Sequence, residues 1–306
     1  MRQQTMRQQR IIGCDVRAGS CRAWSLPADE TCAGTARRLF KDAVAHLGLE
    51  REVLDDAVLM TSELAVNTLR DATAARTGEL DTADPVVTGH PELWLYLRGL
   101  GLRRELVCKV FDCYRGWLHG PPAGPDPLSA HAASGRGLLI VHELSAGRWG
   151  HHPTRARLGE RARRGMAVWF AVPAPFAHAR LADVTGLRAY TRSADVSAAR
   201  ARERICSRQA ARELEAMLNE RGFSRSGGGL VRSDGLGGEM QVLALGHGLT
   251  LRCLSGGVSL TGPDGCRDRW SYADLVETVE ETIRRYEELD PDQPRFRMAR
   301  DAYITA

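Results

Sequence analysis

The spacing of apolar residues changes along the first half of the chain, and this change limits the folds open to it. Between residues 31 and 47, and again between 52 and 72, apolar side chains recur every three or four residues, as on helices with one buried face. Glu92–Leu97 and Glu105–Asp112 instead follow the period of two that is typical of strands. Helices of this kind bury their apolar faces against a sheet, so the pattern predicts an α+β fold.

The remaining elements of this half complete a domain that we place at residues 23–175. The expected elements are an opening strand Ala23–Leu26, a helix Leu138–Ser145, and closing strands Trp149–His151 and Met166–Val172. Thr73–Pro91 and Cys113–Ser134 predict loops, and the second is long and rich in Gly and Pro, as functional lids are. We expect the basic segment Arg155–Arg164 to be a solvated loop.

The second half predicts a smaller α+β domain at residues 196–290, arranged α-β-β-β-β-α. Its expected elements are helix Val196–Arg221, strands Leu230–Ser233, Glu239–Leu245, Leu249–Leu254 and Gly257–Thr261, and helix Tyr272–Leu289. The acidic stretch Glu277–Glu288 of the last helix is interpreted as a solvated face. We assign residues 1–22 to a disordered arm, 176–195 to a linker and 291–306 to a surface tail.

Composition argues against several classes of protein. No run approaches the roughly 20 apolar residues of a membrane helix, and no apolar segment follows the basic N-terminus as in a signal peptide, so we expect a cytoplasmic protein. The 8 cysteines show no paired spacing, which predicts reduced thiols and no zinc. The net charge of +4 is small, and the predicted C-terminal strands lack interleaved aromatic and basic residues, so we expect no direct nucleic-acid binding.

Three polar features occur in an order that suits ATP binding. Glu63 and Asn67 stand one helical turn apart, where an amide oxygen can ligate Mg²⁺ and a carboxylate can accept a proton. Asp112 ends an apolar strand face, where it can accept a hydrogen bond from an adenine amino group. Gly135-Arg136-Gly137-Leu138 opens a predicted helix, where glycines let backbone N–H groups approach phosphates.

Each feature has an ordinary structural explanation when it is taken alone. A Glu–Asn pair at this spacing is usually solvated, a strand-end Asp usually forms a turn, and a Gly-x-Gly before a helix is usually a tight turn. Arg136 can contact a γ-phosphate or simply lie solvated in that turn. Only the joint order and spacing favour a nucleotide site.

The three features resemble the motifs of one family. SELAVNTLRDA (residues 62–72) resembles the N-box of Bergerat-type (GHKL) ATP-binding domains, Val110-Phe111-Asp112 resembles their first glycine box, and GRGLLIV (residues 135–141) resembles their second. Together with the downstream segments, about half of the chain is similar to small anti-sigma-factor serine kinases of actinomycetes. The expected fold is a Bergerat-type sandwich, a mixed sheet covered by helices, followed by the smaller second domain.

The resemblance also implies roles, ligands and partners. It implies Glu63 as general base, Asn67 as Mg²⁺ ligand, Asp112 as adenine contact, and Gly135–Gly137 as lid hinge and phosphate contact. ATP and Mg²⁺ are the implied cofactors. A serine of a small STAS-type anti-sigma-factor antagonist is the implied phosphoacceptor, a sigma factor is the implied second partner, and a homodimer is the implied assembly.

One departure from the family pattern keeps a second function open. The family has Gly two residues after the Asp of its first glycine box, whereas Cys113 and Tyr114 follow Asp112 here, and we expect their side chains to crowd an adenine pocket. The alternative is therefore a degenerate nucleotide-binding scaffold that acts only by binding other proteins. Retention of both Glu63 and Asn67 favours the kinase. A sensor histidine kinase is disfavoured, because no phosphoacceptor His on a helix precedes the domain.

Overall fold

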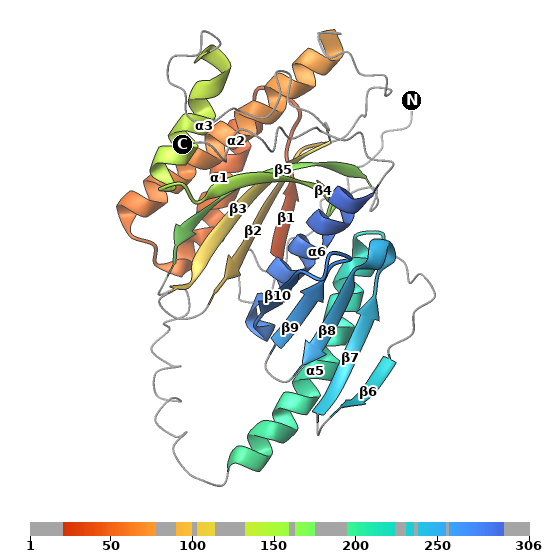
Figure 1. Ribbon diagram of the computed structural model, residues 1–306. Helices are drawn as coiled ribbons and strands as arrows, with labels where there is room; N and C mark the ends of the chain where they lie inside the picture. Colours follow the sequence, from red (N-terminus) through yellow and green to blue (C-terminus); the bar gives the residue numbers. More distant parts are fainter. Residues whose placement is uncertain are drawn as a thin grey trace, which may run out of the picture.

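The structure is a computed structural model that describes residues 21–77, 90–99, 103–113, 132–158, 163–174, 195–223, 231–235, 238–254 and 257–290. It has an α+β architecture with two separate antiparallel sheets (Figure 1). The predicted lid beyond residue 113, most of the arm, the linker and the tail lie outside the described residues. None of the helices in the described ranges has an apolar stretch long enough to cross a membrane.

The first sheet has five strands in the order β1-β2-β3-β5-β4. Their bounds are β1 Cys21–Ser25, β2 Glu92–Arg98, β3 Glu105–Asp112, β4 Trp149–Arg155 and β5 Arg164–Pro173. Every neighbouring pair is antiparallel, so the expected mixed sheet is wrong. Short connections such as the one between β2 and β3 join neighbouring strands, as antiparallel pairing allows.

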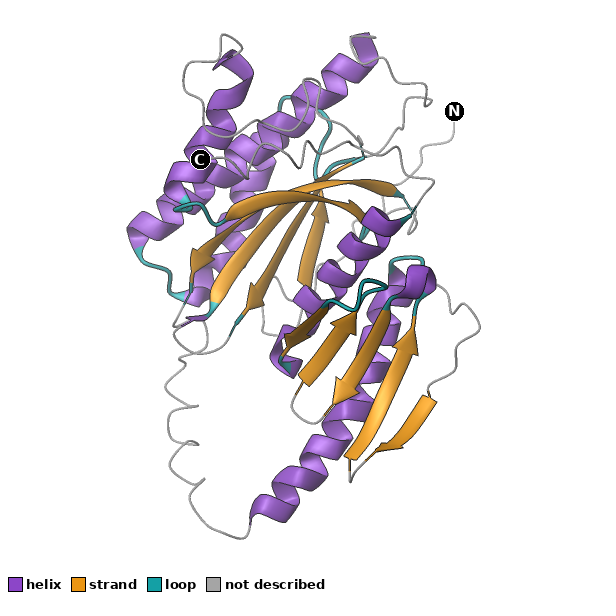
Figure 2. Ribbon diagram, in the orientation of Figure 1, coloured by secondary structure: helices purple, strands orange, loops and turns teal. Residues whose placement is uncertain are grey.

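Three helices cover one face of this sheet (Figure 2). They are α1 Cys32–Val44, α2 Arg51–Thr77 and α3 Ala132–Leu144. A short 3-10 turn, η1 Ala45–Leu47, follows α1 and ends at Gly48 with a φ of 63°, a conformation that glycine adopts without strain. The buried side of α1, including Phe40 and Ala36, packs with Leu64 of α2 and Leu95 of β2 in one core. These are the apolar stripes predicted from the spacing.

The two faces of β3 have different surroundings, one facing the helices of the first sheet and the other facing the C-terminal part of the chain. Leu106, Cys108 and Val110 point into the core beneath α1, α2 and α3. Val107 and Phe111 point to the opposite face, as the period of two in a strand requires. Lys109 also points to the opposite face, where it contacts the C-terminal part of the chain.

The second sheet has five strands in the order β10-β9-β8-β7-β6, all antiparallel. Their bounds are β6 Val231–Gly235, β7 Gly238–Ala244, β8 Thr250–Leu254, β9 Gly257–Thr261 and β10 Arg267–Trp270. Between β7 and β8 lies the short turn η4 Gly246–Gly248, and η5 Tyr272–Asp274 precedes the last helix. Helices α5 Asp195–Glu220 and α6 Leu275–Leu289 pack on one face of this sheet.

Helix α6 lies between the two sheets (Figure 1). Leu275, Val279 and Ile283 belong to the core of the second sheet. Val276 packs instead with Tyr96 and residues of the first sheet, on the face that α1, α2 and α3 leave uncovered. One helix therefore joins the two halves of the molecule.

Several predicted boundaries are wrong for identifiable reasons. Helix α2 continues to Thr77 and α3 already begins at Ala132, because alanines next to each predicted end favour helix. The arm predicted for residues 1–22 is too long, since β1 starts at Cys21. Strand β10 was missed, because its sequence RDRW is charged and this edge strand has no fully buried residue, only alternating exposed and half-buried ones.

Candidate functional site

Helix α2 holds Glu63 and Asn67 one turn apart, at the border of its buried side. Leu64 and Ala65 are fully buried, whereas Glu63 and Asn67 are half-buried. The Thr61 hydroxyl donates to the Ala57 carbonyl at 2.7 Å, which ties the preceding turn of the helix to itself. The two polar side chains therefore stand on a rigid, well-packed element.

Gly137 of α3 lies directly against both of these side chains. A β-carbon placed on Gly137 would be 2.8 Å from Glu63 Oε2 and 3.6 Å from Asn67 Oδ1. The 2.8 Å distance means that a side chain at position 137 would displace the end of the Glu63 side chain, whereas the 3.6 Å distance to Asn67 is an ordinary packing contact. Residues from two motifs about 70 positions apart are thus brought together at one place.

The Asn67 amide group has an incomplete set of hydrogen bonds. Its Nδ2 atom is buried and has no hydrogen-bond partner among the described residues. A buried polar atom normally has a partner in the protein, in ordered water or in a ligand. The Asn67 amide therefore has an unused donor at the junction of α2 and α3, beside Gly137.

Asp112, at the end of β3, is buried on the same side of the sheet as α2. It is 8% exposed and shares its strand face with Cys108 and Val110. The pKa of Cys32 is raised to about 11, chiefly by burial and to a smaller extent by the Asp29 and Asp112 carboxylates, while a hydrogen bond with Thr68 lowers it. The Cys32 thiol in turn donates to the Ala65 carbonyl of α2 at 3.7 Å, and the alternation with Cys108 and Val110 places Asp112 on the side of β3 that faces α2.

Cys113 does not lie on the face that Asp112 occupies. Its side chain is 2% exposed and packs with Trp94, Phe111 and Ala156 on the opposite side of the sheet. The expectation that this residue crowds an adenine pocket beside Asp112 is therefore wrong. Tyr114 lies outside the described residues.

The structure places the remaining predicted residues of the second glycine motif within α3. Because the helix begins at Ala132, Gly135, Arg136 and Gly137 do not precede it, as was predicted, but lie in its first two turns. The Leu138 side chain is 6% exposed and belongs to the core, so only its backbone is available to a ligand. Nothing is described of the Arg136 side chain.

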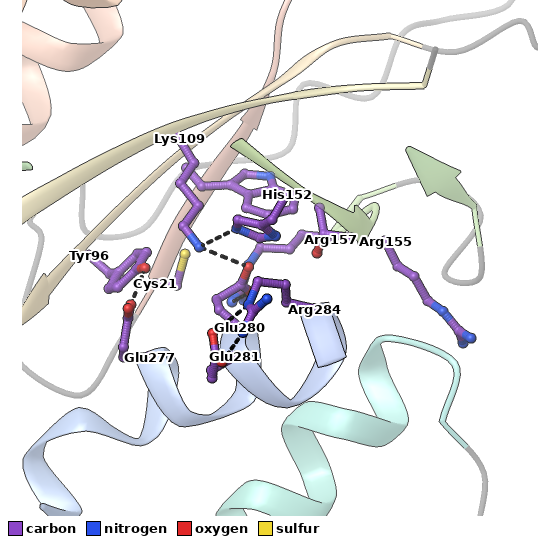
Figure 3. A network of polar contacts seen from close by, with 12 residues as sticks. Cys21, Tyr96, Lys109, His152, Arg155, Arg157, Glu277, Glu280, Glu281 and Arg284 are labelled. Carbon is purple, nitrogen blue, oxygen red and sulfur yellow. Dashed lines mark hydrogen bonds and ion pairs between the residues drawn. The ribbon is translucent and has the colours of Figure 1, made fainter. Parts of the chain in front are cut away.

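A second cluster of polar groups, missed by the sequence analysis, lies on the other face of the first sheet (Figure 3). At its centre is Glu280 of α6, which is 2% exposed and pairs with three cations. Lys109 Nζ lies 3.3 Å from its carboxylate, an Arg157 nitrogen 2.7 Å and an Arg221 nitrogen 2.6 Å. These cations come from β3, from the segment after β4 and from the end of α5. The carboxylate therefore connects both halves of the chain.

Further ion pairs along α6 extend this network. Tyr96 donates a hydrogen bond to Glu277, which also accepts one from Arg98 at 3.1 Å. Arg155 and Arg164, which face each other across β4 and β5, both pair with the fully buried Glu287. The expectations of a solvated basic loop at Arg155–Arg164 and a solvated acidic face at Glu277–Glu288 are both wrong for these residues. The two segments are instead docked on each other.

The charged groups of this network shift the pKa values of their neighbours. The pKa of Glu280 is held well below its usual value by Arg221, Lys109 and Arg157, although burial alone would raise it. The pKa of His152 is lowered to about 3, chiefly by burial and then by Lys109, whose Nζ lies 3.1 Å from His152 Nε2. A cavity of about 210 Å³ lies beside these groups, between the sheet and α6. The lining cations and carboxylates are paired with one another, which is typical of a structural junction.

Sequence signals for this network were present but weak. Lys109 is one of only two lysines and interrupts an otherwise apolar strand. Glu280 and Glu287 are seven residues apart, and therefore lie on one side of α6. Neither signal identifies the partner segment, because ion pairing between distant segments leaves no local pattern in the sequence.

Comparisons with known protein families and with curated proteins found no match to this chain. The function is therefore argued from the residues and their arrangement.

Proposed function

We propose that the chain is an ATP-binding regulatory protein that resembles anti-sigma-factor serine kinases and whose first domain has a Bergerat-type fold. The observation that carries the proposal is the contact of Gly137 with both Glu63 and Asn67. A bound ligand would account for the close approach of the α3 backbone at this point and would supply a partner for the buried Asn67 Nδ2 atom. Cys113 points away from Asp112 and does not crowd that carboxylate, whereas Tyr114, which stands at the family's glycine position, lies outside the described residues.

The residues at this junction fit Mg·ATP. The Asn67 amide oxygen would hold the metal, and the backbone at Gly137 would approach the phosphates. A Mg²⁺ ion at this position would keep waters and phosphate oxygens as its main ligands. Asp112 would accept a hydrogen bond from the adenine amino group.

Bound Mg·ATP would supply the transferable γ-phosphoryl group. Glu63 would accept the proton of the attacking hydroxyl, because its Oε2 atom faces the backbone that would hold the phosphates. By resemblance, the hydroxyl would belong to a serine of a STAS-type antagonist, and a sigma factor would be the second partner. Phosphoryl transfer of this kind depends on positioning and charge stabilisation, which a rigid junction of two helices provides.

Calorimetric titration with Mg·ATP tests this proposal. We expect wild type to bind, and Asn67→Ala to bind about tenfold more weakly or worse, a loss of about 1.4 kcal/mol or more. Glu63→Gln should bind nearly as well as wild type, but its slow release of phosphate from ATP should fall by about 10²-fold or more, as expected when a general base is lost. A folded wild-type protein that gives no binding would contradict the kinase and leave a partner-binding scaffold.

A further inference from the structure

The outer face of the second sheet, which is opposite to α5 and α6, carries a row of arginines. The strand register places Arg252 of β8, Ser259 of β9 and Arg269 of β10 side by side. Arg267 lies two residues before Arg269 on β10. The alternate residues of these strands, such as Leu251 and Val258, point into the core beneath the helices. In Figure 1, no helix covers the outer face. Arg267 and Arg269 are therefore exposed on this face, and Arg252 is half-buried.

These arginines differ from the arginines on α6 and at the end of α5. Arg221, Arg284 and Arg285 each pair with at least one carboxylate. By contrast, Arg252, Arg267 and Arg269 have no ion pair within the part of the chain that the structure describes, and Arg267 and Arg269 are exposed. The one acidic residue of β10, Asp268, points to the other face and pairs with Arg285. On β10, the acidic Asp268 therefore faces the helices, whereas the basic Arg267 and Arg269 lie on the outer face.

Two hydroxyl groups on the same face also lack partners. Ser259 is 2% exposed, and its Oγ atom has no hydrogen-bond partner in the described ranges. Thr261 Oγ1, two residues further along β9, is also buried and without a hydrogen-bond partner in the described ranges. Since neighbouring strands lie about 4.8 Å apart, Arg252 and Arg269 flank Ser259 at a separation of about 10 Å. Guanidinium groups and a hydroxyl at this spacing can all donate to the oxygens of one or two anions.

We propose that the outer face of β8, β9 and β10 is a docking surface for an acidic segment of a protein partner. Its carboxylates would pair with Arg252, Arg267 and Arg269 and accept hydrogen bonds from Ser259 and Thr261. The charge of the surface requires an anionic partner, and the lack of aromatic side chains among the described residues of this face disfavours single-stranded nucleic acid, which stacks its bases on such groups. This surface is independent of the nucleotide site.

Fluorescence anisotropy on the full chain tests the proposal with a labelled peptide of about 12 residues that is rich in Glu. We expect binding at low ionic strength that weakens as salt is added. The triple variant Arg252→Gln, Arg267→Gln, Arg269→Gln should bind about tenfold more weakly or worse, because each exposed ion pair contributes a few-fold. The same peptide with Gln in place of Glu should not bind.

A matched variant separates this surface from general charge effects. Arg38→Gln, Arg51→Gln, Arg103→Gln removes the same charge from exposed positions of the first domain and should leave peptide affinity within about twofold of wild type. Thermal unfolding of both triple variants checks that they are folded. The proposal is wrong if wild type does not bind the acidic peptide, if the outer-face variant binds like wild type, or if a thymidine oligonucleotide binds more tightly through the same arginines.

Discussion

Glu280→Ala is expected to lower the free energy of unfolding by about 3–5 kcal/mol, the usual effect of removing one partner from a buried charge network. The substitution leaves Lys109, Arg157 and Arg221 facing one another without their shared carboxylate. Lys109 and Arg221 are almost fully buried, so water cannot easily compensate. Urea denaturation followed by circular dichroism measures the effect.

A nearby pair on the same helix provides the control for this prediction. Glu288 pairs with Arg284 but its side chain is 42% exposed, so Glu288→Ala should change stability by about 0.5 kcal/mol or less. The double variant Lys109→Met, Glu280→Ala should lose less than the sum of the two single losses, since the groups interact directly. A Glu280→Ala protein as stable as the Glu288→Ala protein would show that the network does not hold α6 on the sheet.

Gly137→Ala is expected to weaken Mg·ATP binding about tenfold or more, and Gly137→Val further still. The added β-carbon would lie 2.8 Å from Glu63 Oε2, so the carboxylate must swing away and the methyl group would keep phosphates from the backbone. Because Gly137 lies within α3, the alanine itself favours the helix by up to about 1 kcal/mol, and the protein should remain folded. Affinity should therefore fall without a loss of stability.

Gly34 provides the matched control, because it also lies within a helix, α1. A β-carbon there would meet only the end of the Arg37 side chain, at 4.0 Å. Gly34→Ala should gain similar helix stability and bind Mg·ATP as wild type does. Equal affinity of the Gly137→Ala and Gly34→Ala proteins would contradict a phosphate site at Gly137.

The first domain was largely predictable because its apolar residues follow strict local periods. The spacing around Phe40 and Leu64 reports which side of each helix is buried, and the alternation at Leu106, Cys108 and Val110 reports the face of β3. The convergence of Glu63, Asn67 and Gly137 needed the order of the motifs as well. What local patterns could not predict was the position of the start of α3, where alanines extend the helix beyond the glycines.

The docking of the two halves was not predictable from local patterns. An acidic helix such as α6 and a basic segment such as Arg155–Arg164 each look solvated when read alone, and only the tertiary fold brings Glu287 to Arg155 and Arg164. As a result, the sheet face opposite to α1, α2 and α3 is covered by the chain's own C-terminal region. Any homodimer, which was expected by resemblance alone, would have to form elsewhere or displace α6.

Hydrogen exchange with and without saturating Mg·ATP is the most direct test of the central claim that three distant segments form one nucleotide site. We expect ATP to slow exchange together in α2 around Glu63–Asn67, at the end of β3 around Asp112, and in α3 around Gly137, because a bound ligand suppresses local opening of the groups it contacts. The second sheet should be unaffected. Protection confined to one of these segments, or found only outside them, would contradict the claim.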